Sequence, residues 1–198
     1  FCRSWRSILL KDSNKEINTK PPEEKSCLQG FIQPIQFWSQ LQPPKDVNEL
    51  TNKSNKILNR IGLTDIQLFN RDSARNWIAK YKPELLISFD TAFHFSIEAD
   101  VFRMAYASIH PCIWIDSDLY PTDLTSKLLN KSLNHNCTVL FLRENTPWIS
   151  NAFFISKKDC IFFNKICDSC LQIDFTNLPK TRSTVQTSFG PARYNSVL

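Results

Sequence analysis

The apolar and polar positions of this chain repeat with two different periods, which predict a series of helices and strands. Apolar positions spaced three or four residues apart predict helices at residues 46–59, 72–81, 96–109 and 159–171. Short apolar or alternating runs predict strands at residues 31–38, 65–69, 112–115, 138–142 and 152–155. Strands that alternate with helices indicate an α/β fold in which a mostly parallel sheet is flanked by helices.

Two interruptions of this pattern bear on the organisation of the chain. Pro34 lies inside the first predicted strand, where its missing N–H indicates a sheet edge or an irregularity. Residues 11–25 are polar and charged and contain the pair Pro21-Pro22, which is typical of a linker or an exposed tail. We therefore divide the chain into an N-terminal tail or linker at residues 1–27 and one globular domain at residues 28–198.

The composition excludes several classes of protein. The chain has 198 residues, of which 42% are hydrophobic and 22% charged, so it can bury a core. Its three glycines cannot form the Gly-rich loop of a P-loop or dinucleotide-binding protein. The net charge of +5 is scattered without a basic stripe, so we expect no nucleic-acid partner. No apolar run approaches the roughly 20 residues of a membrane span, so we expect no transmembrane segment.

The cysteines do not have the spacing of a zinc site. Cys167 and Cys170 form one C-x-x-C, but no second pair or clustered histidine completes the four ligands. Together with Cys160, they fall in the last predicted helix. We interpret all three as small apolar residues that pack on one face of that helix.

Two carboxylates follow the short apolar strand at residues 112–115. Asp116 and Asp118 are separated by a single serine, so both can reach one site if Ser117 points away at a turn. Ligands of α/β sheets bind at the carboxyl ends of the strands, and Mg²⁺ or Mn²⁺ prefers oxygen ligands there. The alternative is that Asp-Ser-Asp merely ends the strand, because these residue types favour turns.

A second charged pair lies on the preceding predicted helix. Asp100 and Arg103 are three residues apart and therefore share a face of that helix. An arginine that faces two carboxylates can pair with one of them or bind a sugar hydroxyl or a phosphate. The alternative is an ordinary ion pair on the surface, although the neighbouring Val101 and Met104 indicate that the helix packs closely on the sheet.

The segment from Ala99 to Pro121 resembles the core of the DXD-type sugar transferases. This family is similar to glycosyltransferase family 32 and includes initiating mannosyltransferases, capsular polysaccharide transferases and, more distantly, the glucosylating clostridial-type toxins. Its pattern is an Asp-x-x-Arg, a hydrophobic run, a Gly-Gly, a short strand ending in Asp-x-Asp, and a proline. The residues that match in register are Asp100, Arg103, Ile113, Ile115, Asp116, Asp118 and Pro121, with Trp114 where tyrosine is usual.

Weaker similarities extend the resemblance over residues 30 to 191. They are the opening strand that ends in Trp38, the segment 148–158 with Asn151, and Phe189-Gly-Pro191, which is similar to a Thr-Gly-Pro turn. Pro111-Cys112 stands where the family has Gly-Gly, so the turn into the strand must be built differently. The chain ends soon after the last of these segments, so we expect a domain that is truncated at its C-terminus.

The resemblance implies a GT-A type fold that binds a nucleotide sugar. The implied reaction transfers a hexose from a UDP- or GDP-sugar to a glycan or lipid-linked acceptor, with Mn²⁺ or Mg²⁺ and with retention of the anomeric configuration. The implied location is the cytoplasm with peripheral membrane contact, or the Golgi lumen as an alternative. The second functional hypothesis is a degenerate carbohydrate- or nucleotide-binding module of the same fold. A metal-dependent phosphohydrolase is disfavoured because it needs more metal ligands than surround Asp116.

The resemblance also implies roles for individual residues. Asp118, with Asp116, would hold the metal ion that neutralises the departing diphosphate. Asp116 would also contact the ribose or the sugar, and Asp100 with Arg103 would hold the sugar hydroxyls during in-line attack. The list of donor-binding residues is completed by Asn151 and Trp38. For Trp38, stacking on the nucleobase competes with a purely core role, which is the favoured interpretation.

Overall fold

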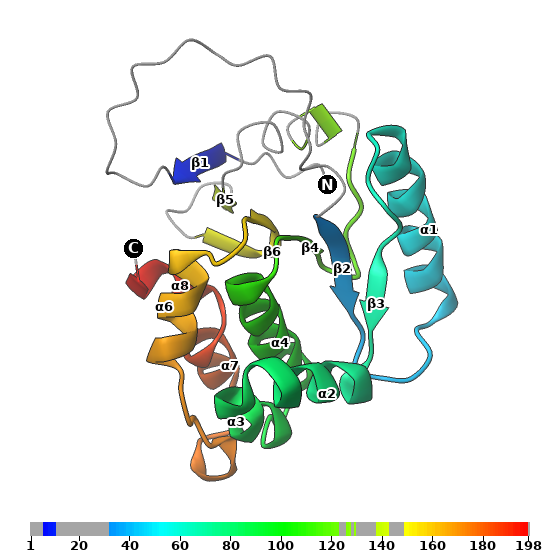
Figure 1. Ribbon diagram of the computed structural model, residues 1–198. Coiled ribbons are helices and arrows are strands. Elements are labelled where there is room, and N and C mark those ends of the chain that lie inside the picture. Colours follow the sequence, from blue (N-terminus) through cyan, green and yellow to red (C-terminus); the bar gives the residue numbers. More distant parts are fainter. Residues whose placement is uncertain are drawn as a thin grey trace, which may run out of the picture.

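The computed structural model describes residues 6–10, 32–122, 126–127, 129, 138–142 and 149–197. The described strands form one six-stranded sheet in the order β1-β5-β6-β4-β2-β3 (Figure 1). The strands are β1 (Arg6–Leu10), β2 (Gln33–Phe37), β3 (Gln67–Phe69), β4 (Cys112–Ile115), β5 (Thr138–Leu142) and β6 (Ile149–Ser156). The helices are α1 (Lys45–Arg60), α2 (Arg71–Tyr81), η1 (Pro83–Leu85), α3 (Leu86–Asp90), α4 (Phe95–Ile109), α6 (Ile161–Ser169), η2 (Phe175–Asn177), α7 (Arg182–Ser188) and α8 (Pro191–Val197).

The sheet is mixed, so the expectation of a mostly parallel sheet is not confirmed. Strands β3, β2 and β4 pair in parallel, whereas β6 is antiparallel to β4 and to β5, and β1 is antiparallel to β5. Only residues 143–148 separate β5 from β6, and a connection of that length joins antiparallel neighbours, because a parallel crossover needs a dozen or more residues. The short connection therefore indicates that β5 and β6 are antiparallel, whereas the alternation of strands and helices along the chain led to the expectation of parallel strands.

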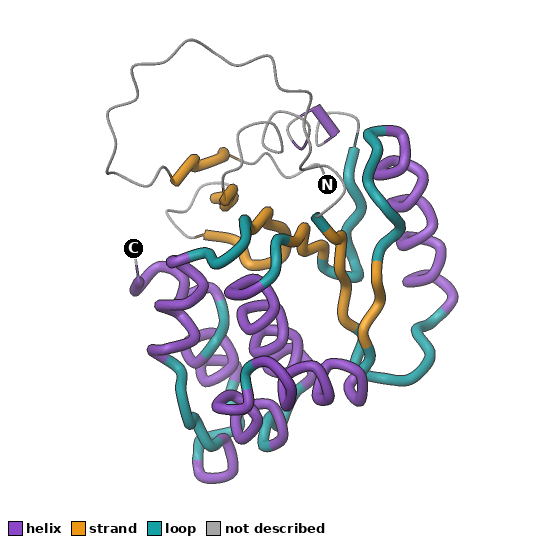
Figure 2. Tube along the Cα trace, viewed as in Figure 1, coloured by secondary structure: helices purple, strands orange, loops and turns teal. Residues whose placement is uncertain are grey.

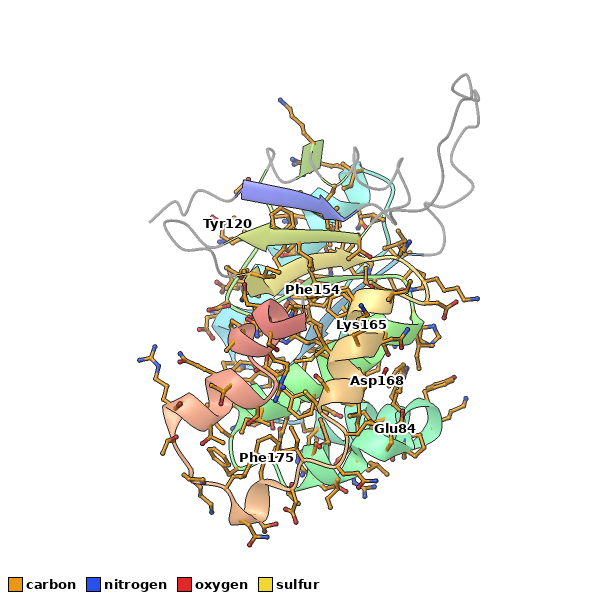
Figure 3. The ribbon with its side chains drawn as sticks, turned by 90° about the vertical axis from the view of Figure 1, so that its left-hand side faces the viewer. Glu84, Tyr120, Phe154, Lys165, Asp168 and Phe175 are labelled. Carbon is orange, nitrogen blue, oxygen red and sulfur yellow. The ribbon has the colours of Figure 1, made fainter. Side chains whose placement is uncertain are left out.

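Helices cover the two faces of the sheet unequally, as Figure 2 shows. Helices α4 and α6 and the C-terminal α8 pack together on one face, and α1 packs its Leu58 on the other. The side chains of β4 alternate accordingly, with Trp114 on the α4 face and Ile113 on the α1 face. Phe154, labelled in Figure 3, lies under the sheet with its ring centroid 4.7 Å from that of Phe163 on α6.

Helix α4 is the central helix of the fold and is buried on all sides. Every residue from Val101 to Ser108 is buried between the sheet and the surrounding helices. A helix in this position is normally apolar all round. Its three buried charged residues are Glu98, Asp100 and Arg103, none of them in its last turn. Burial of charge is costly unless each group has a partner, so these side chains mark a place where polar contacts must be supplied by the tertiary structure.

Two prolines shape the backbone around the sheet, one before β4 and one inside β2. His110 ends α4 with an extended backbone (φ −105°, ψ 141°), which is the conformation that a following proline imposes. Pro111 thus forms the turn into β4, at the position where the DXD-type sugar transferases have Gly-Gly. Pro34 lies in β2 before the ladder with β3, which begins at Ile35 and Gln67, so the expected irregularity is a shortened ladder.

Gly190 joins α7 to α8 at a point with no room for a side chain. A Cβ atom there would lie 2.8 Å from the backbone oxygens of Val185 and Gln186. We therefore expect Gly190→Ala to destabilise the fold by about 1–3 kcal/mol, the usual cost of overpacking against atoms that cannot move freely. Urea denaturation of the variant and the wild type tests this, and equal unfolding midpoints would show that the connection relaxes without cost.

Several expectations fall partly on residues outside the described ranges. Within the segment expected to be a tail, Arg6–Leu10 forms β1, while the boundary at residues 27 and 28 is not described. Trp148, which contributes to the resemblance, is also outside the described part. Cys160, Cys167 and Cys170 are buried free thiols, as their packing interpretation predicts. In the described part of the chain, no helix combines the length and apolarity that crossing a bilayer requires.

Candidate functional site

The parallel strands β2 and β4 end side by side, and their carboxyl ends carry the residues singled out by the sequence. Trp38 follows β2 and donates its backbone N–H to Phe69 at the end of β3 (2.9 Å), while Asp116 follows β4. The antiparallel β6 begins at this same edge, since the backbone N–H of Asp116 donates to the carbonyl of Ala152 (2.8 Å). Three strand ends therefore meet at one place on the sheet, which is where ligands of α/β folds bind.

A cavity of about 540 Å³ opens at this edge. One wall is the segment after β2, a second is the first part of α4, and the third is the end of β4 with the residues that follow it. The lining residues are Phe37, Trp38, Ser39, Gln40, Phe95, Ser96, Ala99, Arg103, Trp114, Asp116, Ser117 and Asp118. This volume and this mixture of aromatic, hydroxyl and charged groups are typical of a small-molecule site.

Arg103 is the centre of the charged part of the site. Its side chain is 5% exposed, and its Nη1 lies 3.1 Å from Asp116 Oδ1 while its Nε lies 3.2 Å from Asp100 Oδ1. Nη1 also donates to the carbonyl of Asn151, and the guanidinium lies 4.6 Å from the ring centroid of Trp114. One arginine thus joins α4, β4 and β6, and its planar geometry is fixed by contacts on several sides.

Asp100 and Asn151 lie behind Arg103. Asn151 Nδ2 donates to Asp100 Oδ1 at 2.7 Å, and both residues are buried. Asp100 is not among the residues that line the cavity, whereas Arg103 is. Burial raises the pKa of Asp100 to about 7, against the opposing effects of Arg103 and the Asn151 hydrogen bond, with Asp116 adding to the rise.

This raised pKa gives a signed prediction for stability. The groups that face Asp100 are Arg103 on its own helix, Asp116 after β4, Asn151 on β6 and Tyr194 on α8. Because the folded pKa exceeds the unfolded value of about 4, the native state binds more protons between about pH 4 and pH 7. The stabilisation is complete below that window and is lost as the pH rises through it.

Asp100→Asn has no proton to lose there. The free energy of unfolding of the variant minus that of the wild type should therefore increase as the pH rises, by up to about 1 kcal/mol per pH unit. Urea denaturation of both proteins at intervals between about pH 4 and pH 8 measures the difference. Curves that stay parallel over this range would contradict the prediction.

Asp116 and Asp118 differ in what they can still bind. Asp116 Oδ1 accepts a hydrogen bond from Trp114 Nε1 (2.7 Å) as well as the contact from Arg103, so its other oxygen is the one left for a ligand. Asp118 is exposed on the cavity wall and has no hydrogen bond or ion pair within the described residues. The described residues contain no group of three or more His, Cys, Asp or Glu side chains that could hold a metal ion.

These two carboxylates fit a Mg²⁺ or Mn²⁺ ion that takes its remaining ligands from a substrate. Such ions are commonly bound through one or two carboxylates together with substrate phosphates rather than by an all-protein cage. Asp118 is the stronger candidate ligand, because it makes no salt bridge with an arginine within the described residues, whereas Asp116 pairs with Arg103. The described part of the chain offers no comparable pair of carboxylates at this cavity.

The structure also brings in residues that the sequence did not single out. Ser39 and Phe95 line the cavity, and Glu98 lies behind its wall. Tyr194, on α8, is fully buried with a hydroxyl that has no partner in the described residues, and burial raises its pKa in spite of nearby Arg103. One signal for these residues was visible in the sequence, because Glu98 is one of three charged residues in a mostly apolar helix.

The environment of Trp38 bears on its two interpretations, stacking on a nucleobase and packing in the core. It is half-buried and lines the cavity, and its indole Nε1 has no hydrogen-bond partner in the described residues. A tryptophan in a closed core would not border a cavity. Its location therefore leaves Trp38 within reach of a ligand in the cavity.

Comparison with known proteins adds little to this geometry. No protein-family model matches the chain, and no curated protein sequence matches it. A solved structure named PaToxG Glycosyltransferase is similar over 86% of this chain and 68% of that chain, with 11% sequence identity and a TM-score of 0.48. A similarity of this degree assigns neither a fold family nor an activity to this chain.

Proposed function

We propose that this chain is a glycosyltransferase that transfers a hexose from a nucleoside-diphosphate sugar to a glycan or lipid-linked acceptor, with retention and with a divalent ion. The observation that carries the proposal is the position of Arg103. It lines a cavity of about 540 Å³ while it is paired with Asp116, and Asp118 stands exposed on the same cavity wall. The proposed fold family is the GT-A type, in agreement with the segment resemblance.

The shape and chemistry of the cavity support a ligand with both aromatic and anionic parts. Ligand sites of about 300–1,000 Å³ are usual for molecules of this size. Trp38 and Phe95 provide ring surfaces on which a nucleobase or a sugar can stack. Arg103 and the two carboxylates provide one fixed positive group beside two negative ones, an arrangement suited to a metal-bound diphosphate.

The proposed mechanism divides the work among the chain's own residues. Arg103 would donate hydrogen bonds to a sugar hydroxyl or a phosphate oxygen, and its fixed orientation would avoid reorganisation during the reaction. Asp100 would act through Arg103, as a positioning residue, because it is enclosed behind the guanidinium. Asp118 and the free oxygen of Asp116 would hold the metal ion. When bound, such an ion neutralises the charge that develops on a departing nucleoside diphosphate.

A second candidate is a binding module of the same fold without turnover. The enclosure of Asp100 favours it, because the carboxylate cannot touch a substrate in this conformation. The enzyme remains the stronger proposal, since the two carboxylates and the arginine that the chemistry needs are all at the cavity.

Two measurements separate these candidates. A thermal melt with UDP or GDP and Mn²⁺ tests binding, because a ligand that binds the native state raises the melting temperature. Sugar release from UDP- and GDP-hexoses with Mn²⁺ tests turnover. A raised melting temperature with sugar release supports the enzyme, and the same shift without release supports the module. No shift with either nucleotide would contradict the enzyme and a nucleotide-binding module, and would leave only a module that binds carbohydrate.

A further inference from the structure

Two of the three walls of the cavity are far apart in the sequence. One wall is the segment Trp38–Gln40, which follows β2, and the other is the first part of α4, with Phe95, Ser96 and Ala99. Residues 39–42 form bends rather than a helix or a strand. Backbone hydrogen bonds hold this wall at two points, from Trp38 to the carbonyl of Phe69 (2.9 Å) and from Arg71 to the carbonyl of Ser39 (3.3 Å), and the rest of its position depends on side-chain contacts.

A single side chain joins the two walls. Glu98 leaves α4 beside the wall residues and accepts a hydrogen bond from the hydroxyl of Ser39 through Oε2 (2.5 Å). Its Oε1 accepts from Nε of Arg71, the first residue of α2, at 2.8 Å. The backbone N–H of Arg71 donates in turn to the carbonyl of Ser39 (3.3 Å), which closes a triangle of three residues.

Burial makes this triangle a strong constraint. Glu98 is 7% exposed, and a carboxylate withdrawn from water requires hydrogen bonds and an opposite charge. Ser39, within the Trp38–Gln40 segment, supplies a hydrogen bond, and Arg71, whose backbone bonds to that segment, supplies a hydrogen bond and the opposite charge. Glu98 itself is not among the lining residues, so it has no ligand to touch from its observed position.

We propose that Glu98 is a positioning residue that fixes the Trp38–Gln40 wall against α4 and so sets the width of the cavity before a ligand arrives. The expected effect of Glu98 on nucleotide affinity rests on the proposed function. Its expected effect on the position of the Trp38–Gln40 segment does not. Preorganisation of this kind strengthens binding because the ligand does not have to order the segment.

The chain supplies a matched control on the same helix. Arg75 of α2 pairs with Asp90 of α3 at 2.7 Å, so Asp90→Ala and Glu98→Ala each remove one carboxylate from an α2 arginine. Asp90 does not line the cavity. Ser169→Ala on α6 is the control for Ser39→Ala, since both remove a hydrogen-bonded hydroxyl but only Ser39 lines the cavity and bonds to Glu98.

The first measurement is amide hydrogen exchange of residues 38–42 in the ligand-free protein. We expect Glu98→Ala to speed this exchange by about tenfold or more and Ser39→Ala to do so to a smaller degree, because local opening becomes easier. The two controls should leave it unchanged. Glu98→Gln should restore most of the protection, since an amide can still accept from Arg71 and donate to Ser39.

The second measurement is the dissociation constant for UDP or GDP with Mn²⁺. Glu98→Ala should weaken binding at least about fivefold, which corresponds to about 1 kcal/mol. The double variant with Ser39→Ala should bind no more weakly than Glu98→Ala alone, because both changes break one contact. Asp90→Ala and Ser169→Ala should remain within about twofold of the wild type.

The outcomes are distinct for the two proposals. If Glu98→Ala lowers thermal stability as Asp90→Ala does, but changes neither exchange nor affinity, Glu98 is an ordinary structural residue and the inference is overturned. If the wild type binds neither nucleotide, the proposed function fails, and hydrogen exchange alone then decides whether Glu98 holds the wall.

Discussion

Asp118→Asn should abolish metal-stimulated sugar transfer and leave the fold intact. The reason is electrostatic, because an amide cannot supply the negative charge that holds a divalent ion beside a diphosphate. Asp118 is exposed and makes no ion pair within the described residues, so its loss should change the free energy of unfolding by no more than about 1 kcal/mol. Burial raises the pKa of Asp116, Arg103 and the Trp114 indole lower it, and Asp118 adds to the rise. Removal of that repulsion favours the variant in the absence of metal.

The measurements are sugar release from UDP- and GDP-hexoses over a range of Mn²⁺ concentrations, together with thermal melts. Asp168→Asn is the control, because it removes another exposed carboxylate, on α6, where Figure 3 labels it away from the sheet. Wild-type turnover in Asp118→Asn would refute the metal role. A collapsed fold would instead favour the interpretation in which Asp-Ser-Asp only ends the strand.

Arg103→Met should produce the largest loss of stability, about 3–5 kcal/mol. Methionine preserves much of the side-chain volume but leaves Asp100 and Asp116 without their shared cation, and it leaves the carbonyl of Asn151 without its donor. An uncompensated buried charge is costly, and the stacking of the guanidinium on Trp114 is lost as well. Chemical denaturation of the variant and the wild type gives the difference.

Two comparisons identify the cause. The double variant Arg103→Met with Asp100→Asn should recover part of the loss, because one of the two unpaired carboxylates is gone. Arg75→Met breaks a similar contact, but the pair with Asp90 is 43% and 34% exposed, so its cost should be much smaller than that of Arg103→Met. If Arg103→Met and Arg75→Met cost the same, burial of the charge cluster is not what stabilises this region.

The sequence determined the local structure well where a local rule applies. The period of apolar residues placed α1, α2 and α4 within one residue of their observed starts, and the apolar run at 112–115 is β4. It also identified Asp116 and Asp118 as residues at the carboxyl end of a buried strand. Each of these predictions depends on neighbours within a few turns or a few strand residues, which the sequence displays directly.

The length of the connection from β5 indicates the direction of β6 relative to β5, but the pairing of β6 with β4 was decided by the tertiary structure. The short apolar run at residues 152–155 does not by itself indicate which strand lies beside it. Because β6 runs antiparallel to β4, its beginning, and not its end, lies at the edge where β4 ends. That reversal brings Asn151 to Asp100 and its carbonyl to Arg103.

The contacts of the site were likewise decided by packing between distant segments. The i,i+3 spacing of Asp100 and Arg103 predicted a shared helix face, but it left open an exposed pair or a buried one. Asp100 and Arg103 are buried because α4 is enclosed between the sheet and the other helices. Ser39 meets Glu98 across 59 positions of sequence, and Asn151 meets Asp100 across 51. No periodicity records such contacts, because they depend on how the strands order themselves in the sheet, which is fixed only when the whole core is assembled.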